Sequence, residues 1–475
     1  MDNTTLRRTV SFSVVIFFLI YVLSRGIGVE VSGHKIADSL GLSTSSKINF
    51  PDFSQYLHVR ALSAKELSLA SENHRAIVVG DIHGQSFSLQ AFLLEVNYHP
   101  ERDRLIHTGD IIVKGTLAGS RTVLSYMTKH NVTGVRGNHD QMVLEWRAWI
   151  EWVQSFSEGR TWLATVEQKW MEDSSSTATT TLEDEEEDGE YEVETEGELD
   201  PEEWIETQKG KVGKGGRKWW DRIPKGWKMF SDHYKIARGM TSAEYDYLRS
   251  LPLILHLPSE HTFIVHAGLL PYDPTRSITS QRQPLARLPD LLNTNVKAST
   301  AELREAQESA VLTEIKQNTD PWVILNVRNI LHNKSLSKST KHGAPWTGSW
   351  NSVMPRCVGY EKLTHGKSVV NDKFLPCHPS TVIYGHTASR GLDVHRWTVG
   401  LDSGCVYGRK LTGLVLDKAH RHKGKPERAD DPNESRKATI SFGDDGQARL
   451  VSVQCHKHKE KKGKHGQDKL DDRSL

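Results

Sequence analysis

The chain has 475 residues, with 61 lysines and arginines against 60 aspartates and glutamates, so its formal net charge at pH 7 is +1. This length allows one large domain or two, and the balanced charge provides no overall positive field for binding nucleic acid. Four cysteines are too few for a scaffold held together by disulfides.

Residues 1–30 differ from the rest of the chain. Arg7 and Arg8 precede an apolar run at residues 10–23, which Arg25 follows. The run is slightly short for a membrane-spanning helix, which needs about 17–25 residues. A cleaved secretory signal and an uncleaved signal anchor both fit. Because no small-residue cleavage site follows the run, the pattern favours an anchor with a cytoplasmic tail. The rest would then lie in a lumen or outside the cell.

Residues 31–70 are polar and rich in serine, which predicts a luminal stalk before a body at residues 71–455. Three glycosylation acceptor triplets, at Asn131, Asn333 and Asn433, could be used only on the luminal side. Cys357 and Cys377 flank one loop and could pair in an oxidising lumen. Cys405 is expected to be a buried packing residue.

Five short apolar runs, at residues 76–79, 104–108, 134–136, 262–265 and 381–384, each end at a residue of a metal-binding type. They are typical of buried strands. Glycine lies beside most of these ends, where it allows the backbone to turn sharply and approach an ion closely. Side chains at the carboxyl ends of strands gather where sites of α/β sheets form. The candidate ligands are Asp81, His83, Asp110, Asn138, His266 and His386.

The segments between these runs predict long insertions. Trp146, Trp149 and Trp152 have helical spacing, which indicates a packing face more than a substrate platform. An insertion at about 172–218 contains an acidic run, residues 183–203, and a basic one, residues 209–218, and both are expected to be disordered. A second insertion, about 273–379, has helical composition at 301–317. Strands at 438–441 and 448–453 complete a sheet, and the basic tail 456–475 is expected to be disordered.

The apolar runs carry recognisable motifs: Gly-Asp-Ile-His-Gly at 80–84, Gly-Asp-Ile-Ile-Val-Lys-Gly at 109–115, Gly-Asn-His-Asp at 137–140, His-Ala-Gly-Leu at 266–269 and Gly-His-Thr at 385–387. In this combination and order, the chain resembles the calcineurin-like metallophosphoesterase superfamily over about residues 77–416. The resemblance implies an α/β fold, a four-layer α/β/β/α sandwich of two mixed sheets, interrupted here by long insertions.

The resemblance also implies residue roles. Asp81 and His83 would bind one divalent ion, Asp110 would bridge two, and Asn138, His266 and His386 would complete the second site. Zinc is expected, with manganese, cobalt or iron as alternatives, because oxygen and nitrogen ligands together suit these metals. A hydroxide between the ions would attack phosphorus. His139 matches the family's general acid for the leaving oxygen.

Departures from the family pattern bear on the substrate. In Ser/Thr protein phosphatases of this superfamily, an aspartate supports the catalytic histidine and an arginine binds phosphate, where this chain has Val113 and Lys114. A phosphate leaving from a P–O–P linkage needs less acid assistance than a serine alkoxide, so the loss of the carboxylate favours a phosphoanhydride substrate. Lys114 and Arg390 are the predicted phosphate contacts. The motifs at 385–391 and 400–405 also resemble the bacterial diadenosine tetraphosphatase branch.

Together with a membrane anchor, these features resemble the fungal vacuolar zinc-dependent endopolyphosphatases. The sequence therefore predicts a membrane-anchored hydrolase in the vacuole lumen or another secretory compartment that cuts inorganic polyphosphate internally. Two other enzymatic activities stay open, those of a Ser/Thr protein phosphatase and of a dinucleoside polyphosphate hydrolase. A tethered binding protein with a silent phosphatase fold is the alternative that is not an enzyme.

Overall fold

A computed structural model of the chain describes residues 50–67, 74–176, 199–213, 217–289, 299–360, 373–417 and 437–455. The chain divides after Pro51, and the architecture below is that of the unit Asp52–Leu475. The predicted anchor at 10–23, most of the acidic run and the basic tail lie outside the described residues. Within the described ranges, none of the helices has the length and apolar character needed to cross a membrane.

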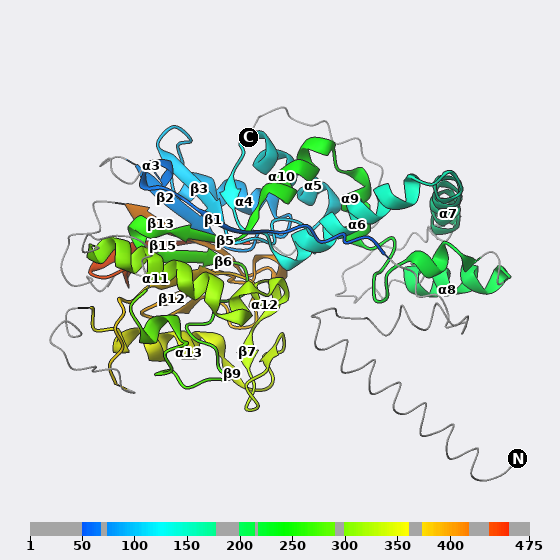
Figure 1. Cartoon of the computed structure of the whole chain (residues 1–475). Coiled ribbons are helices and arrows are strands. Elements are labelled where there is room, and N and C mark those ends of the chain that lie inside the picture. Colours follow the sequence, from blue (N-terminus) through cyan, green and yellow to red (C-terminus); the bar gives the residue numbers. More distant parts are fainter. Residues whose placement is uncertain are drawn as a thin grey trace, which may run out of the picture. The chain divides into compact units, whose positions relative to one another are not determined.

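Two six-stranded mixed sheets form the centre of this unit (Figure 1). The order in the first is β14 (Lys437–Phe442), β15 (Gly446–Gln454), β13 (Lys410–Asp417), β2 (Arg75–Val79), β3 (Asp103–His107) and β4 (Thr133–Gly134). The order in the second is β1 (Leu57–Ala61), β5 (Pro252–Leu257), β6 (Thr262–Val265), β10 (Thr381–Tyr384), β12 (Thr398–Gly400) and β11 (Asp393–Val394). The pairs β2–β3, β3–β4 and β6–β10 are parallel.

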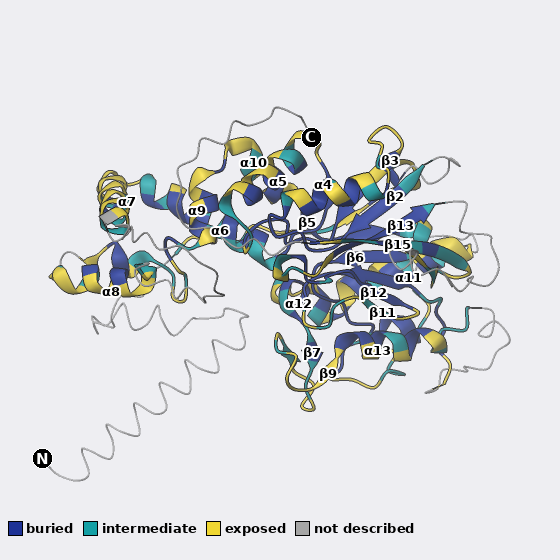
Figure 2. Cartoon of the chain, turned by 180° about the vertical axis from the view of Figure 1, so that it is seen from behind, coloured by how far each residue is buried: buried dark blue, intermediate teal, exposed yellow. Residues whose placement is uncertain are grey.

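Alternation along the strands explains how the layers pack. In β2, Ala76 and Val78 face the second sheet, whereas Ile77 and Val79 face helices on the other side. Both faces of such a strand are buried, which is why its sequence is a continuous apolar run. Figure 2 shows the strands as buried and the helices as exposed on their outer sides. The layers follow the order helix, sheet, sheet, helix, which confirms the predicted fold class.

Helices cover the outer face of each sheet. The first sheet packs against α4 (Ser86–Glu95), α5 (Leu117–Lys129), α6 (Asn138–Gln154) and α10 (Ser242–Ser250). The second packs against α11 (Thr300–Glu314), α12 (Pro321–Asn326) and α13 (Trp346–Val353), so the predicted helix at 301–317 is confirmed within a few residues. A small third sheet has the order β8 (Leu336–Ser337), β7 (Asn329–Ile330) and β9 (Ala344–Pro345).

The tryptophan helix continues into an inserted helical segment. Trp146 and Trp149 of α6 are buried, which confirms them as core residues. Around them pack aromatic side chains from α7 (Ser157–Ser176), α8 (Pro201–Lys211) and α9 (Asp232–Gly239). The prediction that the insertion 172–218 is disordered was wrong for its described part, because Trp204 and Ile205 give α8 an apolar face to bury.

Two further expectations need correction. Residues 57–67 are not stalk, because Leu57–Ala61 pairs in parallel with β5 and α3 (Ala64–Leu67) follows it.

The predicted Cys357–Cys377 disulfide is present. Cys405, however, is bonded to Cys455. The antiparallel pairing of β13 with β15 brings the end of β15 beside the loop of Cys405, a proximity that a sequence separation of 50 residues hides.

Candidate metal centre

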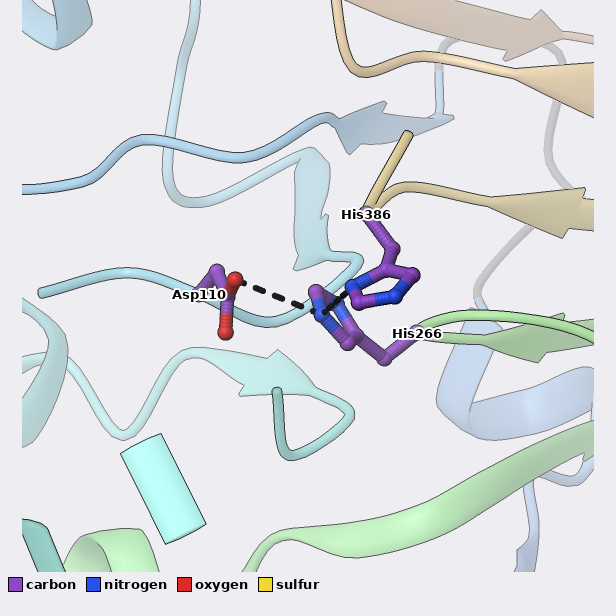
Figure 3. A group of neighbouring side chains, drawn as sticks. All are labelled: Asp110, His266 and His386. Carbon is purple, nitrogen blue, oxygen red and sulfur yellow. Dashed lines mark hydrogen bonds and ion pairs between the residues drawn. The ribbon is translucent and has the colours of Figure 1, made fainter. Parts of the chain in front are cut away.

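All six predicted ligands gather where strands of the two sheets end. Asp81 and His83 follow β2, Asp110 follows β3, and Asn138 begins the helix after β4. From the other sheet, His266 follows β6 and His386 follows β10. The carboxyl ends of parallel strands lie at one edge of a sheet, and the two sheets place these edges side by side. Figure 3 shows Asp110, His266 and His386 turned toward one another.

Two overlapping groups of ligand atoms share Asp110. One group is Asp81, His83 and Asp110, the other is Asp110, His266 and His386, and the ligand atoms within each group lie within 4.8 Å of one another. His266 Nε2 lies 3.3 Å from Asp110 Oδ2 and 3.1 Å from His386 Nδ1. Asn138 Oδ1 lies 3.0 Å from the same nitrogen. Because Asp110 belongs to both groups, its carboxylate could contact two neighbouring divalent ions.

The histidine and aspartate side chains are held in orientations that suit metal binding. His266 Nδ1 lies 2.9 Å from the carbonyl oxygen of Thr108. Because a carbonyl oxygen only accepts, Nδ1 carries a proton, and Nε2 is the nitrogen that faces the centre. Burial lowers the pKa of His266, but the adjacent Asp110 outweighs burial and raises this pKa to about 9, so a bound cation would have to displace the proton on Nε2. Asp140 accepts hydrogen bonds from the backbone N–H groups of Asp110, Ile111 and Gly137 and so fixes the loop that carries the shared aspartate.

Three of the six candidate ligands have a strained backbone. His83, Asp110 and His386 have φ angles of 49°, 51° and 71°, in the left-handed region that residues other than glycine rarely adopt. Such strain persists only where the surrounding structure enforces it, and it is common at functional sites. Gly385 allows the two sheets to meet here, because a Cβ at this position would lie 1.9 Å from Asp81 Oδ1.

The charges of the centre fit bound cations. Burial and the neighbouring Asp402 raise the pKa of Asp81 well above its ordinary value, and a bound cation would offset both effects. Burial lowers the pKa of His83 to about 3 and leaves the ring neutral, and its Nδ1 is buried without a hydrogen-bond partner. Neutral imidazoles, buried carboxylates and an amide oxygen form a donor set for transition metals. That these residues bind metal stays a prediction.

A pocket of about 430 Å³ opens beside the cluster. Its lining contains three cationic side chains and no acidic one. The lining residues are Lys114, Asn138, His139, Asn326, Arg328, Lys338, Ser339 and His386. Arg328 donates from Nη2 to the carbonyl oxygen of His386 and from Nη1 to that of Lys338. The structure thus places predicted Lys114 at the pocket and adds two cations that sequence reasoning missed.

Predicted Arg390 does not line this pocket. Its Nη2 donates to Asn329 Oδ1 at 2.6 Å and to the carbonyl oxygen of Arg328 at 3.1 Å. It therefore holds the start of β7, next to Arg328. Arg328 and Lys338 come from a segment, residues 328–346, that contains four lysines and arginines and no acidic residue. That charge bias was the signal in the sequence that could have pointed to them.

His139 lies at the mouth of the cluster. Its backbone N–H donates to Asp110 Oδ1, and its ring lines the pocket. Burial lowers the pKa of His139 to about 4. The ring nitrogen Nδ1 lies 2.9 Å from Nε2 of His233, a residue that the sequence analysis did not identify.

Part of this chain is similar to known proteins. Residues 74–253 match the family model described as calcineurin-like phosphoesterase. Over 99 residues the chain is 36% identical to serine/threonine-protein phosphatase 1 of Salmonella typhimurium, which covers 21% of this chain and 45% of the relative. It is 42% identical over 69 residues to a symmetrical bis(5'-nucleosyl)-tetraphosphatase of Actinobacillus pleuropneumoniae, covering 14% of this chain and 25% of the relative. The matched segments thus span less than half of these relatives.

Two solved structures align with most of this chain at low sequence identity. A proposed diadenosine tetraphosphatase has 17% sequence identity and a TM-score of 0.37, with 84% of this chain and 99% of the other covered. A protein serine/threonine phosphatase from Saccharomyces cerevisiae has 11% identity and a TM-score of 0.33, with 87% of both chains covered.

Proposed function

We propose that this chain, which contains a calcineurin-like phosphoesterase domain, is a metal-dependent hydrolase of phosphoanhydride bonds that cuts inorganic polyphosphate internally. The observation that carries this proposal is the pocket beside the ligand cluster, where Lys114, Arg328 and Lys338 converge without an acidic neighbour among the lining residues. Three cations beside a dinuclear centre offer more positive charge than one phosphoryl group needs. This excess supports a substrate with several consecutive phosphates.

The ligand cluster supports the following metal-binding roles. Asp81 and His83 would hold one ion, Asn138, His266 and His386 would hold another, and Asp110 would contribute to both. Bound there, the ions supply charge stabilisation for phosphoryl oxygens and an ionised water as nucleophile. Zinc is the proposed metal, and manganese, cobalt or iron suit the same donors.

The protein's own residues bind the substrate and assist the leaving group. Lys114 and Arg328 neutralise the phosphate being attacked, and Lys338 holds the next phosphate along the chain. His139 donates a hydrogen bond to the leaving oxygen. Because a phosphate leaving group is weakly basic, it needs little proton donation, which agrees with Val113 in place of a carboxylate.

The pocket lining favours an inorganic chain over a nucleotide. Apart from His139 and His386, none of its lining residues is aromatic, so it offers little surface on which a base could stack. Hydrolysis of dinucleoside polyphosphates is the second candidate, because the Actinobacillus relative is named for that activity. A protein phosphatase, and a silent binding protein, are further alternatives that the experiment below separates.

We also propose that the chain works in an oxidising compartment, the vacuole lumen or another part of the secretory pathway, anchored through residues 10–23. Two disulfides, Cys357–Cys377 and Cys405–Cys455, support this location, because such bonds persist in oxidising compartments and are rare in the cytosol.

The test uses the full chain, purified without metal and then supplied with zinc and long-chain polyphosphate. A ladder of intermediate lengths that a chelator abolishes is expected. Accumulation of monophosphate alone would indicate cleavage from the ends, and chelator-sensitive hydrolysis of only dinucleoside polyphosphates or phosphopeptides would reject the proposed substrate. Absence of metal binding would indicate a silent binding protein.

A matched pair of variants tests the pocket. Arg328→Gln should raise KM for polyphosphate by about tenfold, since a charge-assisted contact contributes about 1.5–3 kcal/mol. Lys341→Gln removes an exposed charge of the same segment that does not line the pocket, and should leave KM within about twofold.

A further inference from the structure

His233 contacts the proposed general acid from a part of the chain far from the motifs. It lies in the first turn of α9, and its Nε2 is 2.9 Å from Nδ1 of His139. The two rings are stacked, with centroids 5.1 Å apart and planes inclined by 16°. We infer that His233 is a positioning residue, which holds the imidazole of His139 so that its other nitrogen, Nε2, faces the leaving oxygen. This inference rests on the proposed hydrolase function.

The orientation of this ring needs such a partner. The carboxylate that supports the histidine in related Ser/Thr phosphatases is replaced by Val113, which cannot hydrogen-bond through its side chain. His83 contacts the ring edge-on, with centroids 5.4 Å apart, a contact that does not select a nitrogen. Among the residues that the structure describes, His233 forms the one hydrogen bond to the His139 ring.

The helix that carries His233 is firmly packed. Tyr234, Ile236 and Ala237 of α9 are buried. The ring of Tyr234 meets that of Trp146 edge-on with centroids 5.1 Å apart, and its hydroxyl donates to Glu167 of α7. Since Trp146 belongs to α6, the helix that begins with Asn138 and His139, the two histidines are fixed to one packed cluster. The inserted helical segment therefore serves the centre, although it contains none of the motifs.

The hydrogen bond also selects a tautomer. When His233 Nε2–H donates to His139 Nδ1, the proton of the neutral His139 ring must lie on Nε2. This is the form that can donate to a leaving oxygen. With the opposite direction of donation, Nε2 of a neutral His139 ring would be an acceptor, and only the protonated ring could donate to the leaving oxygen. A partner that sets orientation and tautomer of a catalytic histidine has large effects on rate in other enzymes.

The test compares leaving groups, using aryl phosphates whose phenols span a range of pKa. The variant His233→Leu removes the hydrogen bond at similar volume, whereas His233→Gln keeps a side-chain N–H. Lys235→Leu, at an exposed position of the same helix, is the matched control. His233→Leu should lower kcat about tenfold or more for the most basic phenol, within the 10²–10⁴-fold that a general acid contributes, and should hardly affect 4-nitrophenyl phosphate. His233→Gln should recover part of the loss.

Double variants and spectroscopy separate positioning from general damage. In a His139→Ala background, His233→Leu should cause no further loss, because the group it positions is gone. Equal loss for all leaving groups, or additive losses, would overturn the inference. In the metal-free protein, ¹⁵N shifts of His139 should show the proton on Nε2, with a mixture of tautomers in His233→Leu; unchanged shifts would also overturn it.

The two proposals fail in different ways. Aryl phosphates are monoesters, so a protein that hydrolyses them but not polyphosphate would reject the proposed substrate and leave the role of His233 testable. If His233→Leu does not fold, His233→Gln and the ¹⁵N shifts of the folded wild-type protein still decide the direction of the hydrogen bond.

Discussion

Gly385→Ala is expected to damage the first metal site selectively. A Cβ at position 385 would lie 1.9 Å from Asp81 Oδ1, whereas such a contact essentially never falls below 3.0 Å, so the carboxylate must move by about 1 Å. Asp81 also accepts hydrogen bonds from the backbone N–H of His386, at 2.9 Å, and from the hydroxyl of Thr108. Because metal–ligand distances tolerate only about 0.2 Å, the displaced carboxylate can no longer complete the site.

The expected result is a loss of metal affinity of about 100-fold, with a similar loss of turnover at limiting metal. Isothermal titration calorimetry of the metal-free protein with zinc measures the first, and release of phosphate from polyphosphate measures the second. Circular dichroism establishes that the variant is folded. A folded Gly385→Ala protein that binds two zinc ions with wild-type affinity would refute the assignment of Asp81 as a ligand.

Gly348→Ala is the matched control. Gly348 is an exposed residue of α13, and a Cβ there meets nothing within 4 Å. Alanine is favoured over glycine in helices by about 0.5–1 kcal/mol, so this variant should be slightly more stable and should bind zinc as the wild type does.

Three further predictions concern acid catalysis and stability. His139→Ala should lower turnover by about 10²–10⁴-fold for poor leaving groups while the metal content, measured by atomic absorption, stays unchanged; joint loss of metal and activity would indicate a structural role. Val113→Asp should raise hydrolysis of phosphoserine peptides relative to polyphosphate, by about tenfold, in parallel kcat/KM assays; equal effects on both would reject the leaving-group argument. Burial raises the pKa of Glu308, but hydrogen bonds from His256 and His261 outweigh burial and hold the pKa below its ordinary value. The ionised carboxylate therefore stabilises the fold fully above about pH 4.5, and this contribution is lost as the pH falls through the lowered pKa. Glu308→Gln should cost about 2 kcal/mol in urea unfolding at pH 7 and much less at pH 3, and an equal cost at both would contradict this.

The predicted ligand positions depended on local rules. An apolar run of four or five residues followed by glycine and a polar residue indicates a buried strand and the side chain at its end. Because parallel strands present their carboxyl ends at one edge, such positions converge even when hundreds of residues separate them, as for Asp81 and His386. Asp110 is shared by both groups of ligand atoms, as predicted. The two-sheet architecture followed from the same motifs through the family resemblance.

The sequence by itself thus determined the types of candidate ligand, their order and the strands that carry them, because each depends on residues only a few positions apart. Only the tertiary structure revealed the contact between His233 and His139, the approach of Arg328 to His386 and the Cys405–Cys455 bond. Each joins segments separated by 50 to 94 residues. No local periodicity encodes such contacts, since they arise from the packing of the insertions against the sheets.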